Sequence, residues 1–321
     1  MAEPRISRAV RLQFQGDWGQ ANLHRICGWL SQEMLDRAGA GSHIGIWTGR
    51  GGYDAILAAG RGEVDVALAT PTAFAPLAIE GKGIATGEAF ADLCALGTMP
   101  QTDRLVLAID GKFGIRSFEE LRRKAPPLRI ATSPNNGVNV IGYAAQRVMA
   151  LAGMPRATIE AWGGRYIERE RPDTCIALMR DGEADAVIHE AIMTPWWQEL
   201  ADSREVAFLP MEENVLAAME RDERWPRARL PENYLRGMAG PFPTLDFSDF
   251  LLIARHDLPD DVAHMIAWCL CEKRAVLERM YRHIPPERSP VTYPLEPKKI
   301  ATTSIELHPG AERYYREAKL I

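Results

Sequence analysis

The sequence predicts an α/β protein made of two Rossmann-like lobes, and three observations support this fold class. Short hydrophobic strands alternate with helical segments, as in parallel βαβ units. The pattern restarts in mid-chain with a strand over 128–132 and a helix over 139–152. The motif Gly-Glu-x-Asp also recurs, at residues 62–65 and 182–185. We therefore expect a structural duplication with a ligand cleft between the two lobes.

The first lobe begins with three strand–turn–helix units. Its strands are expected at 10–15, 43–47 and 64–69, followed by a further strand at 105–109. Helices are expected up to about residue 37, over 53–59 and after residue 72. Ser117 and Glu120 have the spacing of a capping box, which predicts the start of a short helix.

The second lobe continues with strands at 128–132, 158–162, 184–189 and 205–209, and with helices at 139–152 and 173–179. Residues 221–246 are rich in Pro, Arg and Gly and are expected to form a surface loop. A strand at 250–254, a helix at 259–282, an extended tail with five prolines at 284–297 and a last helix at 308–319 follow. Because these late elements are expected to complete the first lobe, lobe 1 is predicted as 1–108 plus 207–321 and lobe 2 as 109–206, with hinges near 108 and 206.

Composition excludes several classes of protein. The chain is 46% hydrophobic and 25% charged, with a net charge of −5, which is typical of an ordinary soluble domain and gives no basic footprint for nucleic acid. No window approaches the ~18 apolar residues that a membrane helix needs. The five scattered cysteines indicate free thiols rather than disulfides or a zinc knuckle. We expect no cofactor and no metal.

The turn after the strand at 128–132 is the first candidate ligand site. A strand that leads through a polar turn into a helix presents free amides and the positive end of the helix dipole, which favours an anion. Ser133, Asn135, Asn136 and the amides of Gly137 and Val138 are therefore expected to receive a carboxylate. The alternative is an ordinary βα connection.

Two arginines follow a Trp-x-Gly sequence at what are expected to be strand ends. They are Arg50, after Trp47, and Arg165, after Trp162. Both could make bidentate contacts with a carboxylate, or could be surface residues on flexible turns.

The first lobe is expected to add hydroxyls from Thr48, Thr70 and Thr72, although Thr70 could instead cap a helix. Aromatic rings could stack on a ligand or pack in the core. The candidate ligand-binding set is Trp18, Thr48, Gly49, Arg50, Tyr53, Thr70, Thr72, Ser133, Asn135, Asn136, Gly137, Val138, Trp162, Arg165, His189 and Glu190.

His189 and Glu190 end the last strand of the second lobe. This pair could bind a polar ligand or act as acid and base. A metal role lacks a third ligand at suitable spacing, and a histidine bonded to the backbone is an equally good interpretation.

Four segments carry a resemblance to a known family: Thr48 through Leu68, Arg129 to Gly153, Ala177 to Pro210, and Leu258-Pro-Asp-Asp-Val with the closing His308-Pro-Gly-Ala-Glu-Arg-Tyr-Tyr-Arg-Glu. Their order resembles the TAXI family of TRAP-transporter solute-binding proteins, which have the type II periplasmic-binding-protein fold. The resemblance implies TRAP membrane permease subunits as partners. The first turn, Gly16-Asp-Trp-Gly, departs from the family's Gly/Thr-rich turn.

We therefore predict a solute-binding protein that closes around a small organic anion, a mono- or dicarboxylate, for TRAP-type transport, without inserting into the membrane itself. The alternative is a cytoplasmic enzyme on the same scaffold, a decarboxylase or hydrolase of an aromatic carboxylate that uses His189 and Glu190. The N-terminal residues lack an apolar signal core. The predicted location is therefore periplasmic if a signal has been removed and cytoplasmic if Met1 is the native start.

Overall fold

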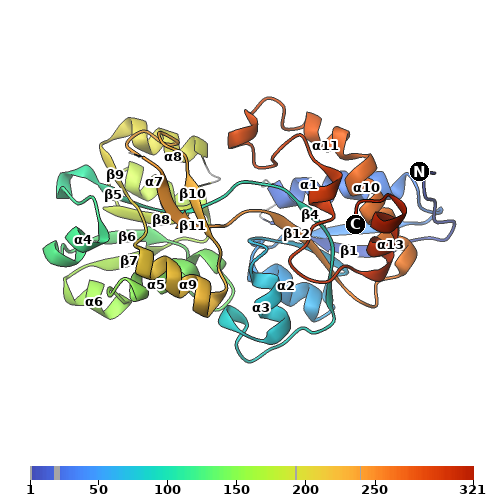
Figure 1. The fold of residues 1–321 in the computed structure, drawn as a ribbon, viewed down its shortest axis with the longest axis horizontal. Helices are drawn as coiled ribbons and strands as arrows, with labels where there is room; N and C mark the ends of the chain where they lie inside the picture. Colours follow the sequence, from blue (N-terminus) through green and yellow to red (C-terminus); the bar gives the residue numbers. More distant parts are fainter. Residues whose placement is uncertain (1, 18–21, 192–193, 239) are drawn as a thin grey trace. The chain divides into compact units, whose positions relative to one another are not determined.

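A computed structural model of the chain describes residues 2–17, 22–191, 194–238 and 240–321 (Figure 1). The chain divides into two units, each with its own sheet and helices. Unit 1 consists of Met1–Thr102 and Ser248–Ile321, and unit 2 of Asp103–Phe247. The chain therefore leaves unit 1 after residue 102 and returns to it at residue 248.

Unit 1 contains a five-stranded sheet in the order β2-β1-β3-β12-β4. The first three strands in sequence are mutually parallel, and β12 runs antiparallel to both of its neighbours. The interior strands β3 and β12 are hydrophobic and buried along nearly their whole length because helices cover both faces of the sheet. The strands are β1 (Arg11–Gln15), β2 (His43–Trp47), β3 (Val66–Ala69), β4 (Leu93–Met99) and β12 (Phe250–Arg255).

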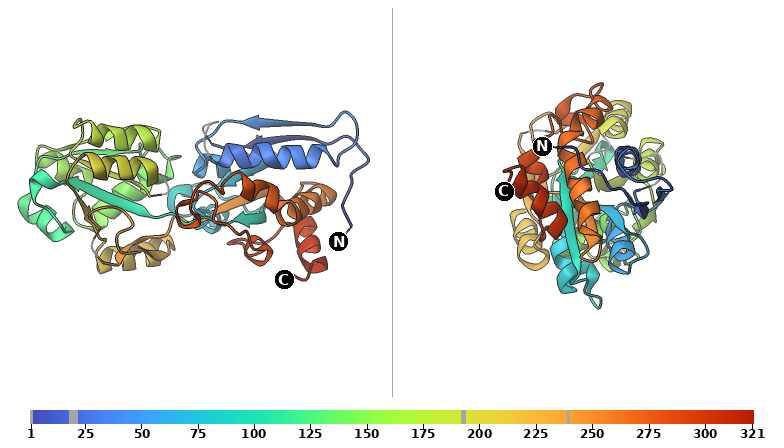
Figure 2. Two further views of the ribbon diagram at one scale, coloured as in Figure 1. Left: turned by 90° about the horizontal axis from the view of Figure 1, so that it is seen from above. Right: turned by 90° about the vertical axis from the view of Figure 1, so that its right-hand side faces the viewer.

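The helices of unit 1 come from both ends of the sequence. Helices α1 and α10 lie side by side and share one hydrophobic core with α13 (Figure 2). The helices are α1 (Asn22–Leu35), α2 (Tyr53–Gly60), α3 (Phe74–Glu80), η1 (Gly83–Ala85), α10 (Asp260–Glu272), α11 (Arg274–Arg279), η3 (Pro286–Arg288), α12 (Pro297–Ile300) and α13 (Pro309–Glu317).

Unit 2 has a sheet of the same topology, in the order β7-β6-β8-β5-β9. Here β6, β7 and β8 are parallel, and β5 runs antiparallel to both β8 and β9. The strands are β5 (Leu105–Asp110), β6 (Arg129–Thr132), β7 (Arg165–Glu168), β8 (Ala186–Glu190) and β9 (Val206–Leu209), with a separate antiparallel pair β10 (Arg227–Leu230) and β11 (Phe242–Leu245).

The helices of unit 2 pack around a second hydrophobic core. Ser117 caps α4 by accepting a hydrogen bond from the amide of Glu120 at 3.1 Å, as predicted. The Glu120 carboxylate reaches back to the amide of Arg116 at 2.8 Å instead of to that of Ser117, so the second bond of the capping box is displaced by one residue. The helices are η2 (Gly111–Phe113), α4 (Phe118–Lys124), α5 (Val140–Leu151), α6 (Arg156–Ala161), α7 (Pro172–Arg180), α8 (Thr194–Ser203) and α9 (Glu213–Glu223).

The aspartate of the recurring Gly-Glu-x-Asp motif makes the same two backbone contacts in both units. The amide of Asp65 donates to the carbonyl of Gln13 at 2.8 Å, and its carboxylate accepts from the amide of Gln13 at 2.6 Å. Asp185 makes the same two bonds with Arg129, at 2.8 and 3.1 Å. The aspartate therefore joins the strand that follows the motif to the first parallel strand of its sheet.

The glycine of the motif ends the preceding helix in both units. Gly62 after α2 and Gly182 after α7 have φ of 71° and 81°, in the left-handed region that glycine adopts without strain. Shared strand order and shared motif contacts support the predicted duplication.

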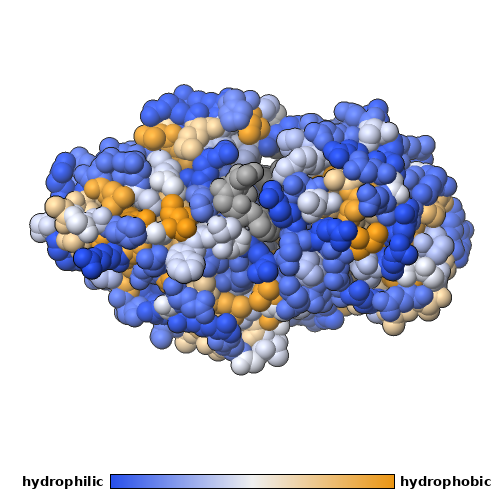
Figure 3. All heavy atoms as spheres, turned by 180° about the vertical axis from the view of Figure 1, so that it is seen from behind, coloured by the Kyte–Doolittle hydropathy of each residue, from blue (hydrophilic) through white to orange (hydrophobic). Residues whose placement is uncertain are grey.

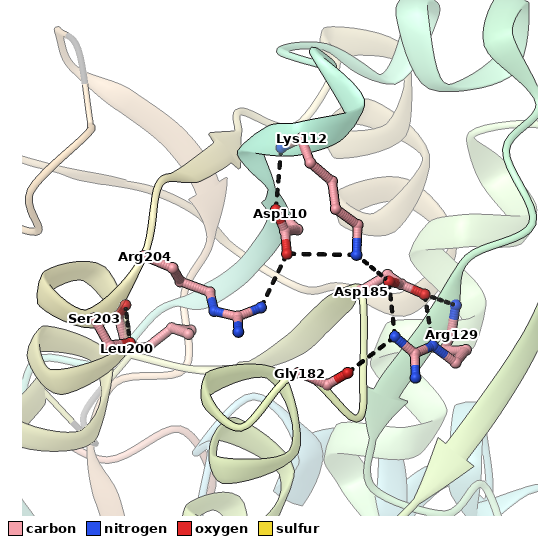
Figure 4. Close-up of polar contacts among 8 residues, drawn as sticks. All are labelled: Asp110, Lys112, Arg129, Gly182, Asp185, Leu200, Ser203 and Arg204. Carbon is pink, nitrogen blue, oxygen red and sulfur yellow. Dashed lines mark hydrogen bonds and ion pairs between the residues drawn. The ribbon is translucent and has the colours of Figure 1, made fainter.

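Asp185 also anchors a network of charges at the amino end of the second sheet (Figure 4). Its carboxylate receives Nε and Nη2 of Arg129 at 2.8 and 3.0 Å and Nζ of Lys112 at 2.8 Å. Asp110 completes the network by accepting from Arg204 Nη1 at 2.9 Å. Burial alone would raise the pKa of Asp185, but the bonds from Arg129 and Lys112 hold this pKa well below its ordinary value.

The structure differs from the predicted organisation in several places. Residues 103–108 and 207–247, expected in lobe 1, belong to unit 2, because β5 pairs with β8 and β9, and β11 lies against β5. The linking segments therefore lie near residues 102 and 248 and not near 108 and 206. The expected loop at 221–246 contains the paired strands β10 and β11. The expected strand at 158–162 is instead helix α6, which begins after Pro155, and the strand in this position is β7, at Arg165–Glu168.

The face in Figure 3 is largely hydrophilic, and its hydrophobic residues form small separate patches. Within the described ranges, every helix is too short or too polar to cross a bilayer.

Candidate functional site

In each unit the predicted site residues that follow parallel strands gather at the carboxyl edge of the sheet. In unit 2 the parallel strands end at Thr132, Glu168 and Glu190. The residues just beyond them are therefore neighbours, and in open α/β sheets ligands bind at this edge.

Ser133 and His189 meet at this edge, within unit 2. Ser133 Oγ lies 3.2 Å from His189 Nε2, and both residues are buried. His189 Nδ1 accepts a hydrogen bond from the amide of Glu190 at 3.0 Å, so the ring proton is on Nε2 and points at Ser133. Burial lowers the pKa of His189 to about 3, which keeps the ring neutral. Ser133 accepts from the ring, and its own hydroxyl hydrogen remains to be donated elsewhere.

The turn after Ser133 is built around two asparagine side chains. Asn136 Oδ1 accepts from the amides of Val138 and Asn139 at 3.2 and 3.1 Å. Asn139, which was not among the predicted residues, caps α5 by accepting from Ile141 and Gly142 at 3.0 and 3.2 Å. The amide of Val138, expected to receive a ligand carboxylate, is therefore already bonded within the turn.

The other residues of this turn are accessible. Asn135, Asn136 and Gly137 are exposed, and Asn135 Nδ2 donates to Gln146 Oε1 at 3.2 Å. Gly137 has φ of 82° and provides the left-handed residue of the turn.

Arg165 lies at the other end of the sheet. It is the first residue of β7 and pairs in register with Arg129, the first residue of β6. Its exposed side chain lines a groove of about 500 Å³ along edge strand β7. Trp162 is half-buried at the end of α6. The structure does not bring Arg165 or Trp162 to the edge that carries Ser133.

Arg169 occupies the place that the sequence analysis gave to Arg165. It follows β7 directly, its amide donates to the carbonyl of Thr132 at 3.1 Å, and its side chain is exposed. Its guanidinium donates to the carbonyl of Glu168 at 2.9 Å. The position of Arg169 at a strand end could have been predicted only from the segment just before it, Arg-Tyr-Ile-Glu, whose hydrophobic pattern is weak.

In unit 1, the turn after β2 carries Thr48, Gly49 and Arg50. Asp54 Oδ2 accepts from the amide of Arg50 at 2.6 Å and from Gln15 Nε2 at 3.2 Å. Burial raises the pKa of Asp54, and hydrogen bonds from the amides of Arg50 and Gly52 partly offset this rise. The turn is fixed through its backbone, and the Thr48 and Arg50 side chains are exposed.

Any side chain at position 49 would displace the polar groups that hold this turn. A Cβ there would lie 2.3 Å from Gln15 Nε2 and 2.9 Å from Asp54 Oδ2. Tyr53, also predicted, is buried as the first residue of α2, whereas Trp47 at the end of β2 is 58% exposed. Trp47 is therefore the accessible aromatic ring at this edge among the residues that the structure describes.

Two further turns complete this edge of unit 1. Thr70 Oγ1 donates to the carbonyl of Asp249 at 3.1 Å, and the carbonyl of Thr72 accepts from Ser304 Oγ at 2.9 Å. Asp17 caps α1 through the amides of Leu23 and His24 at 3.0 and 2.9 Å. Trp18 lies outside the described residues.

The sequence matches the NMT1-like family over residues 26–318. The chain belongs to the NMT1-like family. No curated protein matches it.

The structure of this NMT1-like protein is similar to solved structures of binding proteins. With 14% identity and a TM-score of 0.53, it matches a structure described as a periplasmic transporter, covering 98% of this chain and 95% of that one. It also matches PhnD1 from Prochlorococcus marinus in complex with methylphosphonate, with 13% identity, a TM-score of 0.51 and 97% and 99% coverage. A TctC solute-binding protein from Polaromonas matches with 12% identity, a TM-score of 0.51 and 98% and 99% coverage. The predicted fold class, that of type II periplasmic binding proteins, is confirmed.

The contacts of His189 in this NMT1-like protein differ from those of the histidine in a Ser-His-Asp triad. A serine nucleophile needs an unprotonated Nε2 facing it and a carboxylate that holds Nδ1–H. Here Nδ1 faces a backbone amide and Nε2 donates to Ser133. Among the described residues, no His, Cys, Asp or Glu side chains group in threes that could hold a metal ion.

Proposed function

We propose that this NMT1-like protein is a periplasmic solute-binding protein for a small organic anion, a mono- or dicarboxylate, which it passes to the permease subunits of a TRAP-type transporter. Each unit contributes the residues at the carboxyl edge of its sheet. Ligand capture involves hinge motion in the two segments that link the units, near residues 102 and 248.

One observation carries the proposal: hydrogen-bond donors and cations follow the strand ends in both units. Unit 1 presents Thr48 and Arg50, and unit 2 presents the hydroxyl of Ser133 and the guanidinium of Arg169. Arginine suits a carboxylate because its planar fork donates two parallel hydrogen bonds.

The acidic groups at the edge of unit 1 do not oppose an anion strongly. The carboxylates of Asp17 and Asp54 are used as acceptors for backbone amides, and burial raises the pKa of both. In unit 2, Glu170 lies between Arg169 and Arg171, so this segment keeps an excess of one positive charge.

The first experiment is a thermal-shift screen with aliphatic and aromatic carboxylates, followed by mass spectrometry of each mixture. A carboxylate present at a hundred times its dissociation constant should add about 2.7 kcal/mol of stability. Recovery of the ligand unchanged supports a binding protein. Loss of CO₂ or addition of water would instead support the enzyme and would contradict the proposal.

The site itself is tested with a matched pair of arginine variants. Arg169→Ala should weaken binding of the carboxylate found in the screen by roughly 1.5–3 kcal/mol, because it removes a charge-assisted contact. Arg165→Ala removes the same charge from the amino end of the same strand and should leave affinity unchanged. Both arginines line the groove along β7, at its two ends. The opposite result, with Arg165 essential and Arg169 dispensable, would place the ligand at the amino end of β7 and refute the proposed site.

A further inference from the structure

A cavity of about 310 Å³ in unit 1 lies apart from the residues discussed above. It lies where β4 ends and β12 begins, next to the segments that lead to and from unit 2. Its lining is rich in hydroxyl groups and consists of Thr98, Pro100, Gln101, Thr102, Asp249, Thr292, Lys299 and Thr302. Its volume is at the lower end of the range of small-molecule sites.

Two of the threonine hydroxyls have fixed directions. Thr98 Oγ1 donates to the carbonyl of Thr302 at 2.7 Å, and Thr302 Oγ1 donates to the carbonyl of Lys298 at 2.8 Å. A hydroxyl has one hydrogen and two lone pairs, so both oxygens retain only acceptor capacity. An occupant of the cavity must therefore supply hydrogen-bond donors.

Thr292 adds a polar atom that lacks a partner. Its amide donates to the carbonyl of Pro100 at 2.8 Å, which holds the residue against the end of β4. Its Oγ1 is buried and has no hydrogen-bond partner within the described part of the chain. An unpaired buried hydroxyl is destabilising, and a ligand hydroxyl would satisfy it both as donor and as acceptor.

The charges of the cavity balance. Asp249 contributes a carboxylate, whose Oδ1 accepts from the amide of Gln101 at 3.0 Å. Lys299 contributes an ammonium group, which pairs with Glu296 at 3.0 Å. The lining itself contains one carboxylate and one ammonium group, so its formal net charge is zero; Glu296 is not among the lining residues.

We propose that this cavity is a second binding site, and that its ligand is a small neutral polyol. A polyol supplies several hydroxyl donors to the threonine oxygens and carries no charge to desolvate. The site is separate from the proposed carboxylate site, so its test does not depend on the proposed function.

The test is calorimetric titration of the full chain with erythritol and ribitol, and with ethylammonium as a charged compound. Carboxylates are left out because they belong to the proposed function. We expect saturable binding of a polyol and no binding of ethylammonium. Amide chemical shifts near Thr98 and Thr302 should change during the titration.

The matched variants are Thr292→Val, which replaces the unpaired hydroxyl by a methyl group, and Thr86→Val, which makes the same replacement at an exposed threonine outside the cavity whose hydroxyl donates to the carbonyl of Gly83. Thr292→Val should weaken polyol binding about tenfold, and Thr86→Val should not change it. Thr102→Val is a second cavity variant, should circular dichroism show that Thr292→Val perturbs the fold. Absence of polyol binding, affinity that is unchanged in the folded cavity variants, or preferential binding of ethylammonium would each overturn the proposal.

Discussion

Replacing Asp185 by asparagine tests what the charged network contributes to unit 2. The carboxylate accepts four hydrogen bonds, three from Arg129 and one from Lys112, and its side chain is 8% exposed. Asparagine keeps one oxygen, so the bond from the amide of Arg129 can persist while the ionic bonds are lost. Because the side chains of Arg129 and Lys112 are 32% and 54% exposed, both cations can be hydrated after the change.

These observations set the size of the effect. Removal of one partner from a fully buried ion pair costs about 3–5 kcal/mol, and a hydrogen bond to a charged group contributes about 1.5–3 kcal/mol. Hydration of the freed cations reduces the cost, so we expect Asp185→Asn to lower the free energy of unfolding of unit 2 by about 2–4 kcal/mol at pH 7. Asp65→Asn is the matched control in unit 1, because among the described residues Asp65 has the backbone partner Gln13 and no ion pair. It should cost about 1 kcal/mol.

Hydrogen exchange of the strand amides measures the stability of unit 2 in Asp185→Asn and that of unit 1 in Asp65→Asn. Amides of β6 and β8 that exchange through unfolding of unit 2 should exchange roughly 30- to 900-fold faster in Asp185→Asn. The folded-state pKa of Asp185 is depressed, so its contribution is present above the unfolded pKa of about 3.9 and is lost as pH falls below it. The difference between wild type and variant should therefore be constant from pH 5 to 8 and shrink below pH 4. Equal losses in Asp185→Asn and Asp65→Asn would show that the ion pairs add nothing to the backbone bond.

Substitutions at three further positions test the carboxyl edge of unit 2. Asn139→Ala removes the cap of α5 and should cost about 0.5–2 kcal/mol, measured by urea unfolding, whereas Asn139→Asp should retain most of the stability. Gly142→Ala places a Cβ 2.2 Å from the carbonyl oxygen of Pro134, so the turn after Ser133 must shift. We expect the free energy of unfolding to fall by about 1–3 kcal/mol and carboxylate binding, measured by calorimetry, to weaken. Wild-type affinity would show that the turn is not part of the site. His189 has a depressed folded-state pKa of about 3, so the free energy of unfolding should fall by up to about 1.4 kcal/mol per pH unit as pH drops below about 6.5. His189→Gln should reduce this slope. An identical slope in the variant would mean that His189 does not stay neutral.

Much of the fold was predictable because most strands of the two sheets carry a hydrophobic signal of their own. Residues 43–47 form β2 as expected, and the hydrophobic run at 66–69 forms β3. Edge strand β7 was missed because its four residues, Arg-Tyr-Ile-Glu, begin and end with charges. The short helix α6 was mistaken for a strand because Ile159 is its only fully buried residue. Residues 207–247 were assigned to the wrong half because the choice of a strand's partner is a tertiary property that periodicity does not encode.

The site was predictable where it follows from chain order and not where it depends on side-chain partners. Ser133 and His189 could each be placed at a strand end, but their contact depends on β6 lying beside β8. The capping role of Asn139 is a local signal that precedes a hydrophobic helical run, and it was available to sequence reasoning. Arg165 could not be placed correctly once α6 had been read as a strand.

In both units a polar side chain accepts hydrogen bonds from the first amides of a helix. Asp17 binds the first amides of α1, and Asn139 binds those of α5. These amides already have acceptors, so recognition of an anion at either edge must depend on side chains. An exposed arginine follows the outer parallel strand of each sheet: Arg50 follows β2, and Arg169 follows β7. The strands β2 and β7 hold equivalent places in their sheets. Affinity that comes from exposed arginines is screened by salt, so the duplicated strand order leads us to expect carboxylate binding that weakens as ionic strength rises.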